Sequence, residues 1–314
     1  MANIREIQSR IKSVQDTMKI TNAMYMISST KLQKARKNLE QTEPYFYTLQ
    51  AMMERIVRHL PELNHPFFDN RDKKPEQDKV RAYVVMTADK GLAGAYNHNV
   101  LKLAEEKLTE HPNTKLYVVG ELGRQYFRHK NISVEEHFTY SAQNPSLHRA
   151  RVISEKLMEE FSNGNVDEVY VIYTDMRNSV VTEPMTIQIL PVAKEDILTS
   201  EVVNAGIYRG EIDFDPSPEI VLDNIIPDYL MGFIYGALVE SFCSEQSTRM
   251  MAMEAANKNA SQMIHDLSIQ YNRVRQAMIT QEITEVIAGA KAQKKKKAAK
   301  KAAAAAEHKN AGCS

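Results

Sequence analysis

The sequence predicts an α/β protein in which long N- and C-terminal helices form an antiparallel coiled coil beside a small Rossmann-like α/β domain. The first supporting observation is the placement of helix breakers. All eleven prolines lie between Pro44 and Pro227, and residues 1–43 contain neither proline nor glycine. Proline costs about 3 kcal/mol in a helix interior and glycine about 1. Both ends of the chain can therefore form long helices, whereas the middle is divided into shorter elements.

The second observation is a seven-residue repeat of apolar side chains near each end, which is typical of a left-handed coiled coil. Nine of eleven stripe positions are apolar near the N-terminus and eight of nine near the C-terminus. One chain supplies both stripes, so the simplest arrangement pairs them antiparallel. Dimerisation of two chains through one end is the alternative. The stripe positions are Ile4, Ile7, Ile11, Val14, Met18, Thr21, Tyr25, Ser28, Leu32, Ala35 and Leu39, and then Met250, Met253, Asn257, Ala260, Ile264, Leu267, Tyr271, Val274 and Met278.

The third observation is the alternation of strand-like and helix-like segments in the middle of the chain. Runs rich in valine and tyrosine predict strands, and the segments between them have helical patterns. Such alternation implies parallel strands joined by right-handed crossovers. The last strand has the alternating pattern of an edge or hairpin strand. The expected strands are 80–89, 115–119, 168–174 and 186–190, and the expected helices are 95–110, 122–130 and 146–162.

Together these patterns divide the chain into five parts. Pro44, after Thr42 and Glu43, is expected to kink the first helix or to start a new helical segment. The proline-rich stretch before the last helix is expected to be a connecting arm. The parts are an N-terminal coiled-coil helix (1–60), an α/β domain (78–192), the arm (193–227), a C-terminal coiled-coil helix (228–290) and a basic Lys/Ala tail (291–314).

Composition excludes several classes of protein. Of the 314 residues, 43% are hydrophobic and 25% charged, which is typical of a globular chain. Cys243 and Cys313 are the only cysteines, so a disulfide framework is excluded and a reducing compartment is expected. We find no run of about 18 apolar residues and no apolar signal core at the N-terminus, so neither a transmembrane helix nor a secretion signal is expected.

Candidate chemical motifs are weak. The loop Lys90–Gly94 lies between a strand and a helix, but it has two glycines where a dinucleotide-binding loop needs three, so a tight turn is favoured. Ser28–Lys31 matches a serine-hydrolase spacing without the companion motifs. The nine histidines show no metal-ligand spacing. No catalytic, cofactor-binding or metal-binding residue is therefore expected.

The basic tail carries eight lysines and one glutamate over 291–314. Such a run can bind nucleic acid or an anionic membrane, but a solvated, partly helical tail is favoured, and no nucleic-acid partner is expected.

Two helix surfaces do not fit a simple coiled coil. Apolar side chains around Ile20, Met24, Met26 and Ile27 spread beyond the stripe, so the helix must be enclosed on several sides there. Near the C-terminal tip, polar residues of 273–282 stand beside apolar ones. This second surface is either a solvated face or a set of directional contacts in a socket.

The terminal and central motifs resemble those of the F-type ATP synthase gamma subunit of bacteria over nearly the whole chain, up to about residue 292. Ala93 stands where that family often has cysteine, and the basic tail runs past the family's usual end. The motifs are Ile11–Val14, Thr17–Thr21, Ala23–Met26 and Ser29–Leu32, then Asp89–Gly94 with Asn97, then Ser244–Gln246, Arg249–Met253, Asn259–Ala260, Tyr271–Gln276, Ile279–Ile283 and Gly289–Ala290.

This resemblance implies a non-catalytic rotor shaft. In the family the coiled coil stands inside a ring of three alpha and three beta subunits, and the α/β domain contacts the epsilon subunit and the c-subunit ring. The resemblance also implies ATP synthesis coupled to ion transport, no cofactor, and a peripheral position on the cytoplasmic face of the bacterial cell membrane. A nucleotide-binding α/β enzyme that dimerises through its coiled coil is the alternative.

Carried over position by position, the resemblance implies contacts with the alpha/beta head and one contact on the side of the c ring and epsilon subunit. Met24 resembles the shaft position near the beta-subunit lever, and Asp215 resembles a foot residue near the c ring. The remaining head contacts are Arg249, Arg275, Gln276, Thr280 and Glu282.

Overall fold

The computed structural model describes residues 4–60, 65–69, 71, 74–178, 181–193, 197 and 217–310, with side chains described up to residue 298. Two compact units are distinguished, residues 1–22 with 255–314 and residues 23–254, and each is considered by itself. The elements are α1 (Ile4–His59), the 3₁₀ turns η1 (Pro66–Phe68) and η2 (Glu76–Asp78), β1 (Arg81–Met86), α2 (Tyr96–Glu110), β2 (Thr114–Val119), α3 (Glu121–His129), α4 (Leu147–Ser162), β3 (Glu168–Met176), β4 (Thr182–Leu190) and α6 (Pro218–Asn310).

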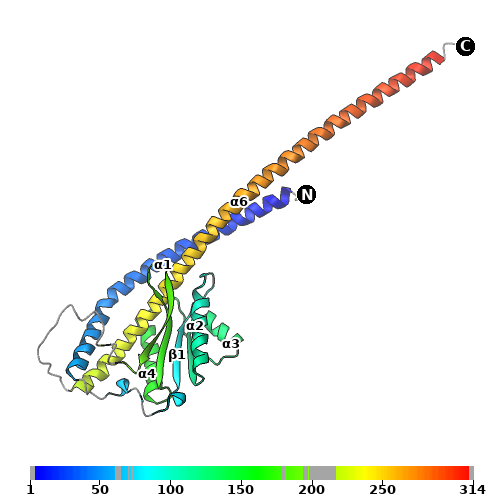
Figure 1. Ribbon diagram of the computed structural model, residues 1–314. Coiled ribbons are helices and arrows are strands. Elements are labelled where there is room, and N and C mark those ends of the chain that lie inside the picture. Colours follow the sequence, from blue (N-terminus) through cyan, green and yellow to red (C-terminus); the bar gives the residue numbers. More distant parts are fainter. Residues whose placement is uncertain are drawn as a thin grey trace. The chain divides into compact units, whose positions relative to one another are not determined.

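The second unit is built around a four-stranded sheet with the order β2-β1-β3-β4 (Figure 1). β1 pairs with β2 and with β3 in parallel, as the alternation of strands and helices predicts. β4 pairs antiparallel with β3 at the edge, which confirms the expected hairpin strand. The mixed sheet and its helices agree with the predicted α/β class.

The central strand β1 is buried on both faces, which divides the core into two layers. Tyr83 and Val85 pack with apolar residues of α2 and α3 on one face. Ala82, Val84 and Met86 pack on the other face with α4 and with the parts of α1 and α6 that belong to this unit. The two long helices therefore form part of the core beside the sheet.

The C-terminal helix begins earlier and ends later than the sequence analysis predicts. It starts at Pro218 rather than at residue 228, and Pro227 lies inside it. The amide of Ile220 lies 3.5 Å from the hydroxyl oxygen of Ser217 just before the helix. A capping serine followed by proline at the first helical position is a helix-start signal, and it outweighed the high proline content of the stretch. The helix continues through the tail to Asn310, because alanine and lysine are good helix formers.

The first helix also differs from one of the two expectations at Pro44. α1 runs without interruption from Ile4 to His59 with Pro44 inside it, so no separate helical segment starts there. The hydroxyl of Thr48 donates to the Pro44 carbonyl at 2.8 Å.

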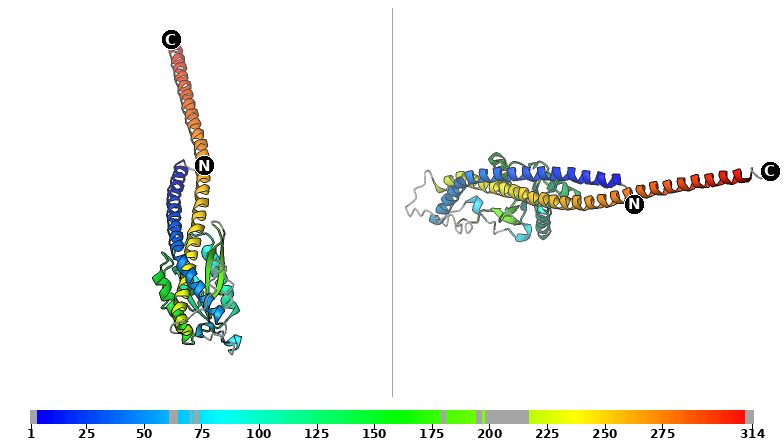
Figure 2. Two further views of the ribbon diagram at one scale, coloured as in Figure 1. Left: turned by 90° about the vertical axis from the view of Figure 1, so that its left-hand side faces the viewer. Right: turned by 90° about the horizontal axis from the view of Figure 1, so that it is seen from above.

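In the first unit, the start of α1 lies antiparallel to α6. The hydroxyl of Thr21 donates to Asn257 at 2.5 Å, and that of Ser261 contacts the Met18 sulfur at 3.6 Å. Residue numbers therefore increase along α1 as they decrease along the facing part of α6. Within 4–22 the six predicted stripe positions are buried or half-buried, and every other residue is exposed. The predicted stripe on α6 is likewise shielded from Asn257 to Val274. Figure 2 shows α6 continuing past the start of α1.

One segment of α6 is apolar enough, by length and composition, to cross a membrane, with a mean hydropathy of 1.2 over 18 residues. The sequence-based exclusion of any such segment was therefore too strong. However, 61% of that window is buried inside the protein, which is the behaviour of a core helix packed against its neighbours.

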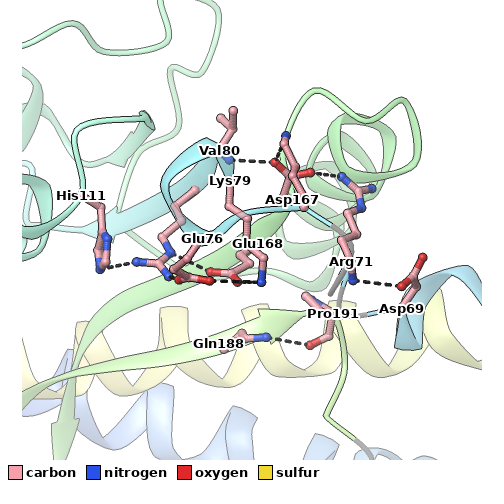
Figure 3. Close-up of polar contacts among 12 residues, drawn as sticks. Asp69, Arg71, Glu76, Lys79, Val80, His111, Asp167, Glu168, Gln188 and Pro191 are labelled. Carbon is pink, nitrogen blue, oxygen red and sulfur yellow. Dashed lines mark hydrogen bonds and ion pairs between the residues drawn. The ribbon is translucent and has the colours of Figure 1, made fainter.

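A charged network joins the segment before β1 to the ends of β1 and β3 (Figure 3). The Glu168 carboxylate accepts hydrogen bonds from Arg81 Nε at 2.6 Å, Tyr170 Oη at 2.9 Å and Lys79 Nζ at 3.0 Å. Burial by itself would raise the pKa of Glu168, but these donors outweigh it and lower the pKa below its ordinary value. Arg81 also contacts Glu76 and His111.

The neighbouring Asp167 forms a second centre of this network. It accepts from Lys74 Nζ at 2.5 Å, and from Arg71 Nη1 and the Val80 amide at 2.7 Å each. These donors overcome the effect of burial and lower the pKa of Asp167. The chain between α1 and β1 is thus tied to the sheet by directional bonds.

Candidate partner interface

The tip of α6 is a helix without a partner in the described part of the chain. The antiparallel register ends near Val274, because α1 begins at Ile4, and every side chain from 275 to 298 is exposed. Exposed apolar side chains gathered on one helix are typical of a surface that a partner covers. The exposed apolar residues of the tip, with their exposed fractions, are Met278 (46%), Ile279 (47%), Ile283 (55%), Val286 (72%) and Ile287 (52%).

Four of the predicted contact residues lie together on this tip. Arg275, Gln276, Thr280 and Glu282 are all exposed within about two turns of helix. The Thr280 hydroxyl donates to the Gln276 carbonyl at 2.9 Å. Its proton is therefore used within the helix, whereas its oxygen can still accept a hydrogen bond. The tip therefore offers a cation, an amide and a carboxylate beside apolar side chains.

Met24 lies on a second apolar surface, on α1 in the second unit. It is half-buried, and its neighbours Met26 and Ile27 are 63% and 56% exposed. Methionine is flexible and polarizable, so such a surface can adapt to a partner that changes shape. In the first unit, Ile20 of the same helix and Met263 of α6 are also exposed, at 62% and 50%.

Arg249 occupies a different kind of place from the other predicted contacts. It is buried, and its guanidinium is used inside the chain: Nη2 donates to the carbonyls of Lys90 and Gly91, both at 3.1 Å, and Nη1 pairs with Glu245 at 2.6 Å. Burial raises the pKa of Glu245, and the Arg249 charge opposes that rise. The spacing of a glutamate four residues before an arginine was the sequence signal for this pair.

The β1–α2 loop has the geometry of a packed turn. Gly94 has φ +53°, and a Cβ there would lie 3.0 Å from the Thr248 side chain of α6. The close approach that needs glycine is thus to helix α6. This favours the interpretation as a tight turn rather than as a pyrophosphate-binding loop.

Asp215 lies outside the described residues. No group of three or more His, Cys, Asp and Glu side chains in the described ranges is arranged to hold a metal.

Comparison with known proteins decides the family. A family model described as ATP synthase matches residues 3–293. The ATP synthase gamma chain of Ruminiclostridium cellulolyticum is 43% identical and covers 92% of this chain and 98% of its own length. The chain belongs to the ATP synthase gamma chain family. A sodium-ion-specific gamma chain of Acetobacterium woodii is 38% identical, with 92% of this chain and 98% of the relative covered.

Solved structures share the fold at lower identity. A chain of the Euglena gracilis mitochondrial ATP synthase, in a structure of the OSCP, F1 and c-ring, aligns with a TM-score of 0.59 and 17% identity, covering 92% of this chain and 94% of that one. A chain of the Tetrahymena thermophila central stalk and c-ring aligns at 0.55 and 23%, covering 76% and 99%.

Family membership confirms the resemblance inferred from the sequence and the expectation of a non-catalytic rotor subunit of an F-type ATP synthase. The chain is associated with the membrane through that complex. The alternative of a nucleotide-binding enzyme is excluded by the same membership. The family match ends at residue 293, where the basic tail continues.

Proposed function

We propose that this chain is the central shaft that couples ion flow through a membrane ring to ATP synthesis or hydrolysis in the alpha/beta head. The observation that carries the proposal is the end of helix pairing near Val274, beyond which α6 exposes an apolar tip. A single helix of this kind fits an apolar cavity, and a ring of alpha and beta subunits would enclose such a cavity.

Coupling follows from the asymmetry of the two helices. The pair has no threefold symmetry, so each beta subunit meets a different face of the shaft. Each shaft angle then stabilises a different conformation at each nucleotide site, through differential contacts. By reciprocity, nucleotide binding and release at the three sites drive the shaft angle.

The predicted contacts take distinct parts in this proposal. Arg275, Gln276, Thr280 and Glu282 would contact the head around the α6 tip, and Met24 would contact the beta-subunit lever. Arg249 would act from inside, by fixing the β1–α2 loop that it holds through Lys90 and Gly91. Asp215 is assigned to the c-ring and epsilon side by resemblance alone. The complex would lie on the cytoplasmic face of the bacterial membrane.

The test is purification of the tagged chain from a membrane extract, with identification of the stoichiometric partners. We expect alpha, beta, epsilon and c subunits. Replacing an apolar tip residue, Ile283→Asp, should release alpha and beta subunits, because an unpaired carboxylate would enter an apolar cavity. The control Glu285→Gln changes a charge on the same turn and should keep the complex. Recovery of the chain without alpha and beta subunits would refute the proposal.

A further inference from the structure

Asp89 follows the end of β1, and its carboxylate accepts four hydrogen bonds from two separate segments. Oδ1 accepts from the Glu121 amide at the start of α3, at 3.0 Å. Oδ2 accepts from the Ser141 hydroxyl at 2.5 Å and from the amides of Ala142 and Gln143 at 3.1 and 3.3 Å. Donors from two segments far apart in the chain thus converge on this half-buried carboxylate, so Asp89 fixes the loop 141–143 relative to β1 and α3.

The same loops reach both long helices. The Gln143 side-chain oxygen accepts from Lys31 Nζ of α1 at 3.0 Å. On the other side, the carbonyls of Lys90 and Gly91, directly after Asp89, accept from Arg249 of α6 at 3.1 Å each. Lys31, Gln143, Asp89 and Arg249, which we call the Asp89 clamp, therefore form a continuous polar connection from α1 to α6 through the α/β part of the unit.

Directional bonds add to the apolar packing that holds the two long helices beside the sheet. The hydrophobic attraction within that shared core is itself non-directional. Charge-assisted hydrogen bonds have defined geometry and are the stronger class of such bonds. Glu245 lies one helical turn before Arg249 on α6 and forms an ion pair with it at 2.6 Å.

We propose that Asp89 is a positioning residue that locks the α/β part of this unit onto both long helices in one angular register, so that they turn together. It acts through Gln143 on α1 and through the Lys90–Gly91 carbonyls on α6. The inference rests on the proposed shaft function and adds to it the place where torque passes between the α/β part and the helices.

The test uses the assembled complex in inverted membrane vesicles carrying Asp89→Asn. Asparagine keeps the shape of the side chain, but its amide group is a donor where the loop presents further donors. We expect ions pumped per ATP hydrolysed to fall by about twofold or more, while the hydrolysis rate itself persists. The control Glu106→Gln makes the same kind of change on an exposed site of α2, whose partner Lys102 is 3.9 Å away, and should leave the ratio unchanged.

A second pair of variants separates positioning from general folding. Gln143→Leu removes the acceptor for Lys31, and Gln143→Glu keeps it, whereas both retain the backbone amide that donates to Asp89. The ratio should fall in the leucine variant and be restored in the glutamate variant. The two Gln143 variants also test the positioning role if the Asp89→Asn complex fails to assemble.

An unchanged ratio in assembled Asp89→Asn, or equal ratios in the two Gln143 variants, would overturn the inference while leaving the shaft function in place. Failure of the wild-type chain to purify with the complex would instead remove the shaft function, and the Asp89 clamp with it.

Discussion

Gly232 of α6 lies directly against the ring of Phe46 of α1, so close that a Cβ at residue 232 would stand 2.1 Å from the Phe46 Cδ1 atom. The ring cannot move aside freely, because it packs against Tyr45 at 5.3 Å and Tyr235 at 6.2 Å between ring centroids. The separation of the two long helices in this unit is therefore set by the absence of a side chain at one position.

Gly232→Ala should destabilise the protein by about 1–3 kcal/mol, because the added methyl group forces the helices apart or the ring out of its place. Gly236→Ala is the matched control one helical turn away, where nothing lies within 4 Å of the added atom. That change should stabilise the helix by up to about 1 kcal/mol. Urea unfolding followed by far-ultraviolet circular dichroism measures both, since the chain has no tryptophan. Equal effects of the two changes would contradict the close approach.

The Asp167 and Glu168 carboxylates should make stability fall in acid. Their pKa values are lowered in the folded protein, so the stability they contribute is present above their unfolded pKa values, about 3.9 and 4.3. It is lost as the pH falls through the lower folded values. Asp167→Asn should lower the free energy of unfolding by about 2–4 kcal/mol at pH 7 and reduce its dependence on pH in acid. Urea unfolding between pH 7 and pH 3 measures this free energy. The same dependence on pH in the variant and the wild-type protein would argue against the network.

Met24→Lys should lower coupling. The residue is half-buried on an apolar surface, and a lysine there would place a charge against the partner's lever, which is costly without a counter-ion. The measured quantity is ions pumped per ATP hydrolysed in vesicles. Ala23→Lys, at the exposed neighbouring position, is the control. A normal ratio for Met24→Lys would remove Met24 from the interface.

Deletion of residues 293–314 should leave the complex assembled. The paired helices end near Val274 and the family match ends at 293, so the tail lies beyond both. Deletion of 275–314 removes the apolar tip as well and should prevent assembly. Co-purification of alpha and beta subunits distinguishes the two truncations. Loss of the complex in the shorter deletion would show that the tail is structural.

Cys243 should be unreactive in the folded protein. It is buried on α6, and burial raises the pKa of its thiol to about 12, so very little thiolate exists at neutral pH. In a Cys313→Ser background, a thiol reagent at pH 8 should label Cys243 only after unfolding in urea. Rapid labelling of the folded chain would show that this part of α6 opens.

Much of the fold could be predicted because long-range packing here repeats a local pattern. The stripe from Ile4 to Thr21 is shielded where the heptad spacing places it, and β4 pairs as the hairpin strand that its alternation indicates. The predicted start of the C-terminal helix at residue 228 was wrong, because the density of prolines was given more weight than the capping pattern Ser217–Pro218.

The candidate site was predictable where it consists of exposed residues on one helix, as for Arg275 and Gln276. The bonds from Arg249 to the Lys90 and Gly91 carbonyls, and those to Asp89 from 121 and 141–143, were not predictable, because these partners lie far away in the chain: 159 positions separate Arg249 from Lys90. Hydrogen bonds of this kind leave no periodic trace in a sequence.

The long helices at both ends, the faces by which they pair and the α/β domain between them in the chain were all predictable, because helix breaking and hydrophobic periodicity act over neighbouring residues. The assembled fold was needed to show that Arg249 faces inward, that Gly232 meets Phe46, and that Asp89 holds the loop 141–143. These depend on the register and distance at which separate elements pack, and such distances are properties of the assembled fold.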